Sequence, residues 1–466
     1  MADERLPTSR LGRLARLAAL GTRAGASRIA SALGSEKSEV SLANVAAEAL
    51  GTMRGLALKV GQMASYVDGF VPEEHRDTYE QAMRKLRDAA PTMTPEEAAK
   101  VIEGELGAPP EELFAAFSRE PFASASIGQV HRAELHDGRK VAVKVQYEGV
   151  ARAVESDLSN ASMLGSLMGP LSDKFAVKDQ LAEMRARFME ELDYRHEAAR
   201  QKAFVDRFAG HPRVRIPEVV EERSARRVLT TTFAEGIRFD EACARSDRER
   251  EAWAETLWMF VMEGVLRHGL FNADPHPGNY LFVDPPGAVN PPGAVDPPGA
   301  VDPPGAVDSP EANGAVWFLD FGCTRALRPE KMELVREAHR ATVLRHDADA
   351  LGALFSEMLD MPGEGEGARI GREYLKLCYA PILARGKFHI TKEYTTRLFT
   401  DLRQGATAMM KGPREEFAPL PSEWLFFNRL QLGFYSVLAR LDVPVDYNAV
   451  ERKILETIDL DGNPAR

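Results

Sequence analysis

Two acidic residues and an asparagine in the stretch 270–325 have the types and the spacing of a phosphoryl-transfer site. Asp274 lies five positions before Asn279, and Asp320 directly follows the apolar run Val316–Leu319. A nucleoside triphosphate with Mg²⁺ needs hard oxygen ligands on rigid mounts, which an aspartate after a buried strand and a nearby asparagine supply. A lone Asp-Phe-Gly triplet would indicate only a turn, but the D-x-x-x-x-N spacing upstream favours chemistry. We predict Asp320 and Asn279 as metal ligands and Asp274 as the residue that faces the attacking oxygen.

A lysine on a predicted strand is the candidate for contacting the phosphates. After Glu111 the pattern becomes that of strands, with a turn at 136–138, and Lys144 alternates with valines in VAVKV. An exposed strand lysine is the alternative interpretation, whereas a kinase strand lysine contacts the α- and β-phosphates. The preceding loop lacks the usual glycines, so its nucleotide contacts must differ from those of ordinary kinases. The predicted nucleotide-binding residues of this loop are Ala123, Ser124, Ala125 and Ser126.

The lysine needs an acidic partner, and a helix predicted over Val177–Phe208 offers three. Its segment MEELDYRHEAAR contains Glu191, Asp193 and Glu197. We expect one of them to meet Lys144, as the αC glutamate does in kinases. The alternative is a solvated charged face.

A second lysine, Lys59, lies with Gln62 in LALKVGQMAS on a predicted helix whose glycines allow another element to approach closely. A lysine among apolar residues requires an acidic partner, although an ordinary surface lysine on a packed helix fits the local pattern. Further upstream, residues 5–35 contain six arginines and no acidic residue. This basic arm is predicted to be flexible or to lie on an anionic membrane surface, and its composition also resembles a transit peptide.

Composition limits the class of protein and its compartment. The formal net charge is −11 over 466 residues, which argues against a nucleic-acid partner because phosphate contacts need a basic footprint. The three cysteines show no CxxC spacing, which suits a reducing compartment and excludes a zinc ribbon. No uninterrupted apolar run reaches the roughly 18 residues of a membrane span. We expect a cytoplasmic protein whose membrane contact, if present, is peripheral.

The predicted fold class is α+β, with helices at both ends of the chain and strands between them. The predicted parts are the arm 1–40, a helical extension 41–110, a strand-rich part 111–232 and a mostly helical part 233–466. A repeated Pro-Pro-Gly tract at 285–308 is predicted to project as a loop from a hairpin, without a catalytic role. Helices are predicted at 248–268 and, after Gly322, near 330–360, 367–384, 392–411, 422–440 and 447–458.

Six ordered motifs resemble those of the UbiB/AarF family of atypical kinase-like proteins. They are KVGQ, ASASIGQVHRA, VAVKVQYEGV, EELDYRHEA, NADPHPGN and LDFGCTR, spread over roughly residues 41–440. The resemblance implies a bilobal protein-kinase-like fold with an N-terminal helical extension, an N-lobe at 111–232 and a mostly helical C-lobe at 233–466. In this fold Lys59 and Gln62 would pack against the nucleotide site and pair with Glu191 and Asp193. The resemblance also assigns Glu197 as the partner of the strand lysine.

The resemblance further implies ATP and Mg²⁺ as cofactors and support of isoprenoid quinone biosynthesis or lipid homeostasis. The partners would be nucleotide, an anionic membrane surface with isoprenoid lipid, and quinone-biosynthesis proteins. The transmembrane helices of the bacterial quinone-biosynthesis type are not expected here. Ser124 departs from the family's alanine run, which puts nucleotide preference in question.

Three hypotheses follow. The first is an ATP- and Mg²⁺-dependent ATPase or kinase that assists lipid-quinone chemistry. The second is a small-molecule phosphotransferase of the aminoglycoside or choline kinase type, against which the KxGQ motif and the alanine-rich loop argue. The third is a nucleotide-binding pseudokinase scaffold, against which the complete set of catalytic residue types argues.

Overall fold

The computed structural model describes residues 93–125, 127–150, 190–283, 313–358, 365–411 and 422–461. Lys59, Gln62 and Ser126 lie outside these residues, as do the arm 1–40, the helical extension up to residue 92 and the tract 285–308. The described chain divides into two compact units. We call residues 93–199 and 219–233 the sheet unit, and residues 200–218 and 234–461 the helical unit. The chain passes from the sheet unit to the helical unit after Phe233, shortly before Gly236.

The sheet unit is built on five antiparallel strands. They are β1 (Ala116–Phe117), β2 (Ala123–Ala125), β3 (Gly128–Glu134), β4 (Lys140–Gln146) and β6 (Val228–Thr232). Their order is β1-β3-β4-β6. Strand β2 pairs antiparallel with the first three residues of β3, from Ala125↔Gly128 to Ala123↔Val130. In β4 the valines 141, 143 and 145 are fully buried, and Lys144 lies between two of them on the opposite face. This period of two confirms the predicted strand and places the lysine away from the apolar core.

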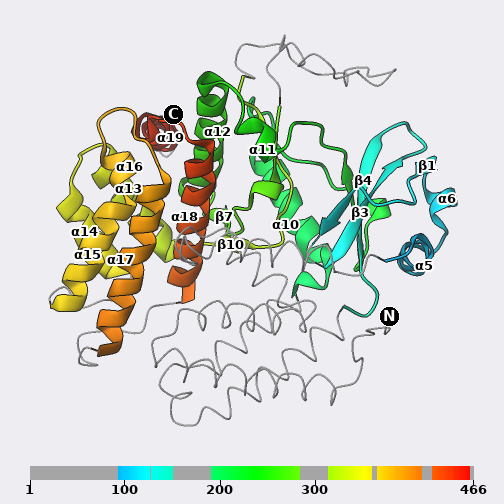
Figure 1. The fold of residues 1–466 in the computed structure, drawn as a ribbon, viewed down its shortest axis with the longest axis horizontal. Helices are drawn as coiled ribbons and strands as arrows, with labels where there is room; N and C mark the ends of the chain where they lie inside the picture. Colours follow the sequence, from blue (N-terminus) through cyan, green and yellow to red (C-terminus); the bar gives the residue numbers. More distant parts are fainter. Residues whose placement is uncertain are drawn as a thin grey trace, which may run out of the picture. The chain divides into compact units, whose positions relative to one another are not determined.

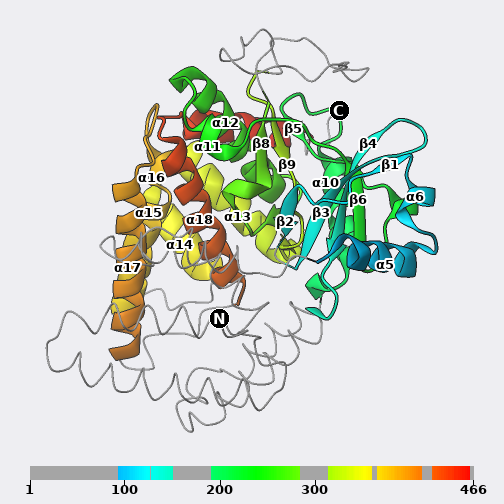
Figure 2. The ribbon, with the colours of Figure 1, turned by 45° about the vertical axis from the view of Figure 1, so that its right-hand side comes forward.

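Helix α5 (Pro95–Leu106) covers the apolar face of this sheet (Figure 2). Thr94 and Glu97 form a capping box at its start, and Gly107 ends it in the left-handed conformation at φ 83°. Its buried Val101 and Ile102 belong to the same apolar cluster as the three buried valines of β4. The short helix α6 (Pro110–Leu113) completes this layer.

The helix predicted over Val177–Phe208 is wrong in one respect, because the chain turns at Leu192 and Asp193. Helix α10 begins only at Tyr194 and ends at Arg207. The Asp193 side chain accepts a hydrogen bond from the Arg195 backbone N–H at 3.1 Å. An aspartate side chain at this position accepts a hydrogen bond from a backbone N–H in the first turn of the next helix. It therefore favours the start of a new helix over continuation of the preceding one.

The helical unit contains most of the helices in the part of the chain that the structure describes. They are α11 (Phe239–Ala242), α12 (Asp247–Leu266), α13 (Pro329–Val343), α14 (Ala348–Met358), α15 (Glu366–Cys378), α16 (Ala380–Leu383), α17 (Lys392–Lys411), α18 (Ser422–Leu441) and α19 (Tyr447–Asp461). Helices α13, α14, α15, α17 and α18 lie side by side in Figure 1. Helix α12 runs through the core, and its Trp253 and Trp258 are each 1% exposed, so both are core residues.

Short strands in the helical unit carry the candidate metal-ligand residues. Strand β8 (Tyr280–Phe282) pairs antiparallel with β9 (Val316–Phe318), and β9 pairs parallel with β5 (Val214–Arg215). Strand β7 (Leu270–Asn272) pairs antiparallel with β10 (Thr324–Ala326). The predicted hairpin around the tract 285–308 is therefore confirmed by the β8–β9 ladder.

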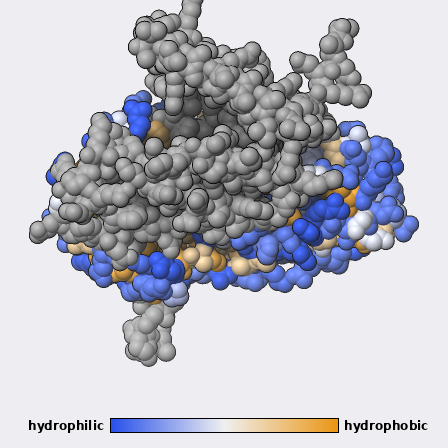
Figure 3. Space-filling model, turned by 90° about the horizontal axis from the view of Figure 1, so that it is seen from below, coloured by the Kyte–Doolittle hydropathy of each residue, from blue (hydrophilic) through white to orange (hydrophobic). Residues whose placement is uncertain are grey.

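The surface of the described residues is largely polar. Phe122, at 37% exposure, is the large apolar side chain that stands out to solvent among them. The coloured atoms in Figure 3 are mostly hydrophilic, with smaller separate hydrophobic areas. Within the described residues, none of the helices is both long and apolar enough to span a bilayer.

Candidate functional site

The candidate metal-ligand segments lie just past two strand ends in the helical unit. Asp274 follows β7 and Asp320 follows β9, each after one intervening residue. The Leu319 N–H donates to the Asn279 carbonyl at 3.0 Å, and the Ala273 N–H donates to the Cys323 carbonyl at 2.8 Å. Backbone hydrogen bonds therefore bring together the three residues that the sequence analysis grouped.

Asn272 ties the two aspartate segments to each other. Its side-chain Nδ2 donates to the Asp320 carbonyl, and its Oδ1 accepts from the Asp274 N–H at 3.1 Å. The sequence analysis did not single out this residue. Its signal was present in the NAD triplet, where a bifunctional amide precedes the predicted catalytic aspartate by two positions.

The loop from Asp274 to Asn279 is closed by its own side chains. The Asn279 Nδ2 donates to the Asp274 carbonyl at 3.0 Å, which leaves its Oδ1 as the amide atom suited to a cation. The His276 Nδ1 accepts from the Gly278 N–H at 2.9 Å and caps the 3₁₀ turn Pro277–Asn279. His276 therefore shapes the turn. Burial, with Asp274 nearby, raises the pKa of Tyr280, so its phenol stays protonated.

The Asp320-Phe321-Gly322 segment forms a tight turn on the core. The Asp320 Oδ1 accepts from the Gly322 N–H at 2.8 Å, and the Phe321 ring is fully buried. A carboxylate and an amide oxygen on hydrogen-bonded turns form a hard-oxygen donor set of the kind that Mg²⁺ accepts. Asp320 and Asn279 therefore fit a magnesium ion chemically.

In the sheet unit, Lys144 forms a two-pronged ion pair with Glu197. Its Nζ lies 2.8 Å from Oε1 and 2.9 Å from Oε2 of that carboxylate. The side chains are 17% and 8% exposed, and the Tyr194 ring centroid lies 5.0 Å from Nζ. Tyr194 and Glu197 are three positions apart on α10, so their side chains reach the ammonium group from the same face of the helix. The predicted pairing of Lys144 with one of three acidic residues is confirmed, with Glu197 as the partner.

The other two acidic candidates lie at the break before α10. Glu191 ends a helical segment, and Asp193 pairs with Arg195, whose guanidinium holds the pKa of that carboxyl below its usual range. Because Lys59 and Gln62 lie outside the described residues, their predicted pairing with Glu191 and Asp193 stays a prediction.

The alanine-rich loop is a short strand rather than an open loop. Residues Ala123–Ala125 form β2, and Ser124 stands opposite Gln129 in β3. The Ser124 side chain also hydrogen-bonds with the Tyr147 phenol. Its hydroxyl therefore has a partner within the sheet unit, which the sequence did not indicate. The predicted nucleotide contacts of Ala123, Ser124, Ala125 and Ser126 remain predictions.

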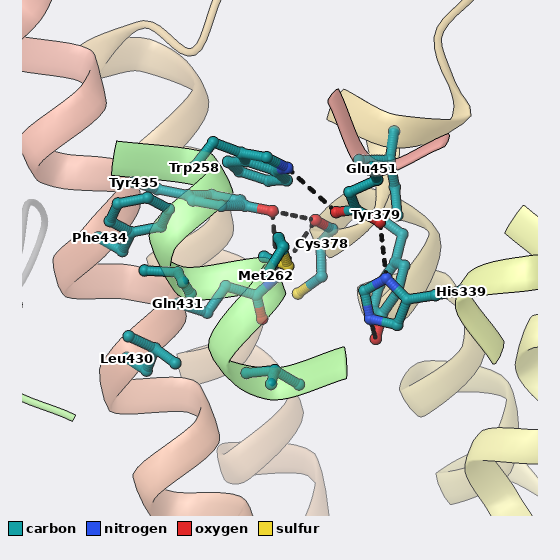
Figure 4. Close-up of a pocket in the computed structure, with 13 residues that line it drawn as sticks. Trp258, Met262, His339, Cys378, Tyr379, Leu430, Gln431, Phe434, Tyr435 and Glu451 are labelled. Carbon is teal, nitrogen blue, oxygen red and sulfur yellow. Dashed lines mark hydrogen bonds and ion pairs between the residues drawn. The ribbon is translucent and has the colours of Figure 1, made fainter. Parts of the chain in front are cut away.

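A cavity of about 40 Å³ lies elsewhere in the helical unit, among α12, α13, α18 and α19 (Figure 4). At its edge the fully buried Glu451 accepts from the Trp258 Nε1 at 3.1 Å and contacts the His339 Nδ1 at 2.7 Å. A space of this size holds roughly a water molecule or two, not a nucleotide. The cavity is therefore a feature of the core and separate from the predicted metal-ligand residues.

The chain is similar to a known protein family, to curated relatives and to a solved structure. The model of the ABC1 atypical kinase-like domain matches residues 85–354. The chain belongs to the ABC1 atypical kinase-like family. This family match, together with similar proteins that are named atypical kinases, confirms the UbiB/AarF resemblance and the kinase-like α+β fold.

Among these relatives, the atypical kinase COQ8B, mitochondrial, of Rattus norvegicus is 33% identical over 295 residues, covering 60% of this chain and 55% of the relative. The atypical kinase COQ8, mitochondrial, of Saccharomyces cerevisiae is 32% identical over 231 residues, covering 49% of this chain and 45% of the relative. The chain thus spans about half the length of these curated relatives. A solved structure, the complex of Rv3197 with erythromycin from Mycobacterium tuberculosis, matches at a TM-score of 0.57 and 28% identity, covering 87% of this chain and 93% of that one.

Proposed function

We propose that this chain is an atypical kinase-like enzyme that uses ATP and Mg²⁺, as an ATPase or a phosphotransferase, in support of isoprenoid quinone biosynthesis or lipid homeostasis. One observation carries the proposal. Asp274, Asn279 and Asp320 share a single hydrogen-bonded frame, in which the Asn272 amide joins the backbones of both aspartate segments. Such a frame supplies the fixed positions that phosphoryl transfer requires.

Each residue has a role in this proposal. Asp320 and Asn279 hold magnesium, which when bound neutralises charge on the phosphate oxygens. Asp274 orients the attacking oxygen, and Lys144 contacts the α- and β-phosphates. Glu197 keeps the lysine ammonium in place and ionised.

The names of the COQ8 relatives support the quinone part of the proposal. We further propose that Lys59 and Gln62 pack on the nucleotide site through Glu191 and Asp193, as the family resemblance implies. The basic arm 1–40 would then bring the protein to an anionic membrane surface, where isoprenoid lipids are found.

The segment after the metal aspartate favours a small acceptor over a protein. Helix α13 starts at Pro329, and the short strand β10 occupies residues Thr324–Ala326 between it and Gly322. This leaves no chain for a long activation loop or a peptide-docking platform. Water, a lipid or a soluble small molecule is the acceptor that we propose, so transfer to a soluble amine or alcohol remains the second candidate function.

The test is steady-state ATP hydrolysis by the full chain with Mg²⁺, with and without anionic liposomes, beside Asp320→Asn. We expect turnover that liposomes stimulate and that the variant lowers by at least ~100-fold, since a metal ligand is lost. Asp240→Asn is the matched control, because this aspartate of the same unit pairs with Arg440 at the surface and should leave turnover unchanged.

Three results would contradict parts of the proposal. Equal turnover in wild type and Asp320→Asn would place the reaction at another site. Turnover without liposome stimulation would remove the membrane part. Nucleotide binding without turnover under every lipid condition would favour the pseudokinase scaffold.

A further inference from the structure

An arginine of helix α10 holds Gly322, which lies two positions after the candidate metal ligand Asp320. The Arg200 Nη1 donates to the Gly322 carbonyl at 2.9 Å, in a partly buried position. Both residues belong to the helical unit. Arg200 was not singled out in the sequence, because nothing in the spacing relates it to a loop 122 positions away.

The same helix also holds the residue before Gly322. The ring centroids of Phe204 and Phe321 lie 5.0 Å apart, and neither side chain is more than 1% exposed. Phe204 is one turn beyond Arg200, so the two side chains leave α10 on one face. Helix α10 therefore contacts two successive residues directly after the candidate metal ligand.

These contacts bear on the Asp320 carboxylate through Gly322. The Gly322 N–H is bound by the Asp320 Oδ1, and its carbonyl is bound by Arg200. The peptide groups on both sides of the glycine Cα are thus held. Because glycine rotates more freely than any other residue, releasing one of them loosens the turn that presents the carboxylate.

We propose that Arg200 is a positioning residue that sets the Asp320 carboxylate for Mg²⁺. This inference rests on the proposed function. A guanidinium is a charged donor, and a hydrogen bond from a charged donor is stronger than one between neutral groups. Magnesium demands near-ideal octahedral geometry at about 2.0–2.1 Å, whereas calcium accepts varied geometry and six to eight ligands. Loss of Arg200 should therefore weaken Mg²⁺ binding more than Ca²⁺ binding.

The experiment measures binding of a fluorescent ADP analogue, mant-ADP, to the full chain during titration with Mg²⁺ or with Ca²⁺. For Arg200→Met we expect the half-saturating Mg²⁺ concentration to rise about 10-fold, and that of Ca²⁺ to rise no more than about 3-fold. Arg200→Lys keeps one charged donor and should restore part of the Mg²⁺ affinity. The control is Arg452→Met, since Arg452 likewise donates to a backbone carbonyl, that of Val343 at 2.7 Å, within the same unit. It should change neither metal.

The ratio of the two metals decides the outcome. An unchanged ratio in Arg200→Met would overturn the inference, because a general loss of structure weakens both metals alike. If Arg200→Met does not fold, Arg200→Gln, which keeps a neutral donor, decides by the same ratio. Wild type without metal-dependent mant-ADP binding would overturn the proposed function first. Metal-dependent binding in wild type with an unchanged ratio in the variant would overturn this inference alone.

Discussion

The two units hold their candidate functional residues by different means. In the sheet unit, Lys144 is placed by side chains, a carboxylate at 2.8 Å and a tyrosine ring at 5.0 Å. In the helical unit, Asp274, Asn279 and Asp320 are placed by bonds that involve backbone N–H and carbonyl groups. The lysine is therefore held by charged and aromatic side chains, whereas several hydrogen bonds, each of small energy, hold the aspartate segments.

This difference has an energetic consequence. Removing one partner of a buried ion pair leaves an uncompensated charge, which costs several kcal/mol. Removing one hydrogen bond from a frame of several costs about 1 kcal/mol and leaves the others in place. Single substitutions should thus affect the sheet unit more than the helical unit.

The largest effect is expected for Glu197→Gln. A small effect of this substitution on stability and turnover would contradict the difference between the two units. We expect about 3 kcal/mol lower free energy of unfolding, because the Lys144 ammonium loses its counter-charge in a site that is 17% exposed. ATP turnover should fall about 100-fold as the lysine moves. Urea unfolding and steady-state hydrolysis measure the two effects.

Two controls accompany this substitution. Glu255→Gln removes the more exposed ion pair with Arg213 in the helical unit and should cost less than about 1 kcal/mol. The double variant Lys144→Met with Glu197→Leu should regain most of the stability but no turnover. Equal losses for Glu197→Gln and Glu255→Gln would show that the Lys144 pair is not special.

An intermediate effect is expected from pH, at a histidine of the helical unit. Burial, helped by Arg213, lowers the pKa of His211 to about 4, and its Nδ1 accepts from the N–H groups of Arg213 and Val214. Above pH 6.5 the imidazole is neutral in both states. Between pH 6.5 and 4 the unfolded chain binds the proton first, so stability falls as pH falls. We expect a loss of about 1–2 kcal/mol after solvent screening.

His211→Asn keeps an acceptor at this turn without a titrating group. The slope of unfolding free energy against pH should therefore flatten between pH 6.5 and 4 in urea titrations. An unchanged slope would assign the pH dependence to other groups, such as His131 of the sheet unit, whose pKa burial also lowers.

The smallest effect is expected for His276→Ala, because several hydrogen bonds hold the loop that contains this histidine. Loss of the bond to the Gly278 N–H should cost about 1 kcal/mol, while the Asn279–Asp274 bond stays. Turnover should fall only a few-fold, and His276→Asn, another good cap, should retain it. Complete loss of Mg²⁺ dependence in His276→Ala would instead make this histidine a metal ligand.

Much of the architecture was predictable, because the periodicity of strands and helices depends on residues that are close together in the sequence. The alternating valines around Lys144 predicted a strand, and the five helical segments predicted after Gly322 begin near the observed positions. Breaks at 344–347 and at Tyr379, which were not predicted, divide the first two of these segments into two helices each. The error at Asp193 shows the limit of this reasoning. Helical periodicity on both sides of the break hid a residue whose side chain prefers to start a helix.

The sequence by itself determined the chemistry on offer: an aspartate and an asparagine five positions apart, an aspartate after an apolar strand, and a lysine among valines. Residue type and short-range spacing are sufficient for that. From the residues alone, Glu191, Asp193 and Glu197 were all possible partners of Lys144, and the family resemblance assigned Glu197. The tertiary structure confirms Glu197 as the partner. It alone also revealed Asn272 and Arg200 as holders of the Asp320 segment. The physical reason is that hydrogen bonds between residues 48 or 122 positions apart depend on how the chain packs, which no local pattern encodes.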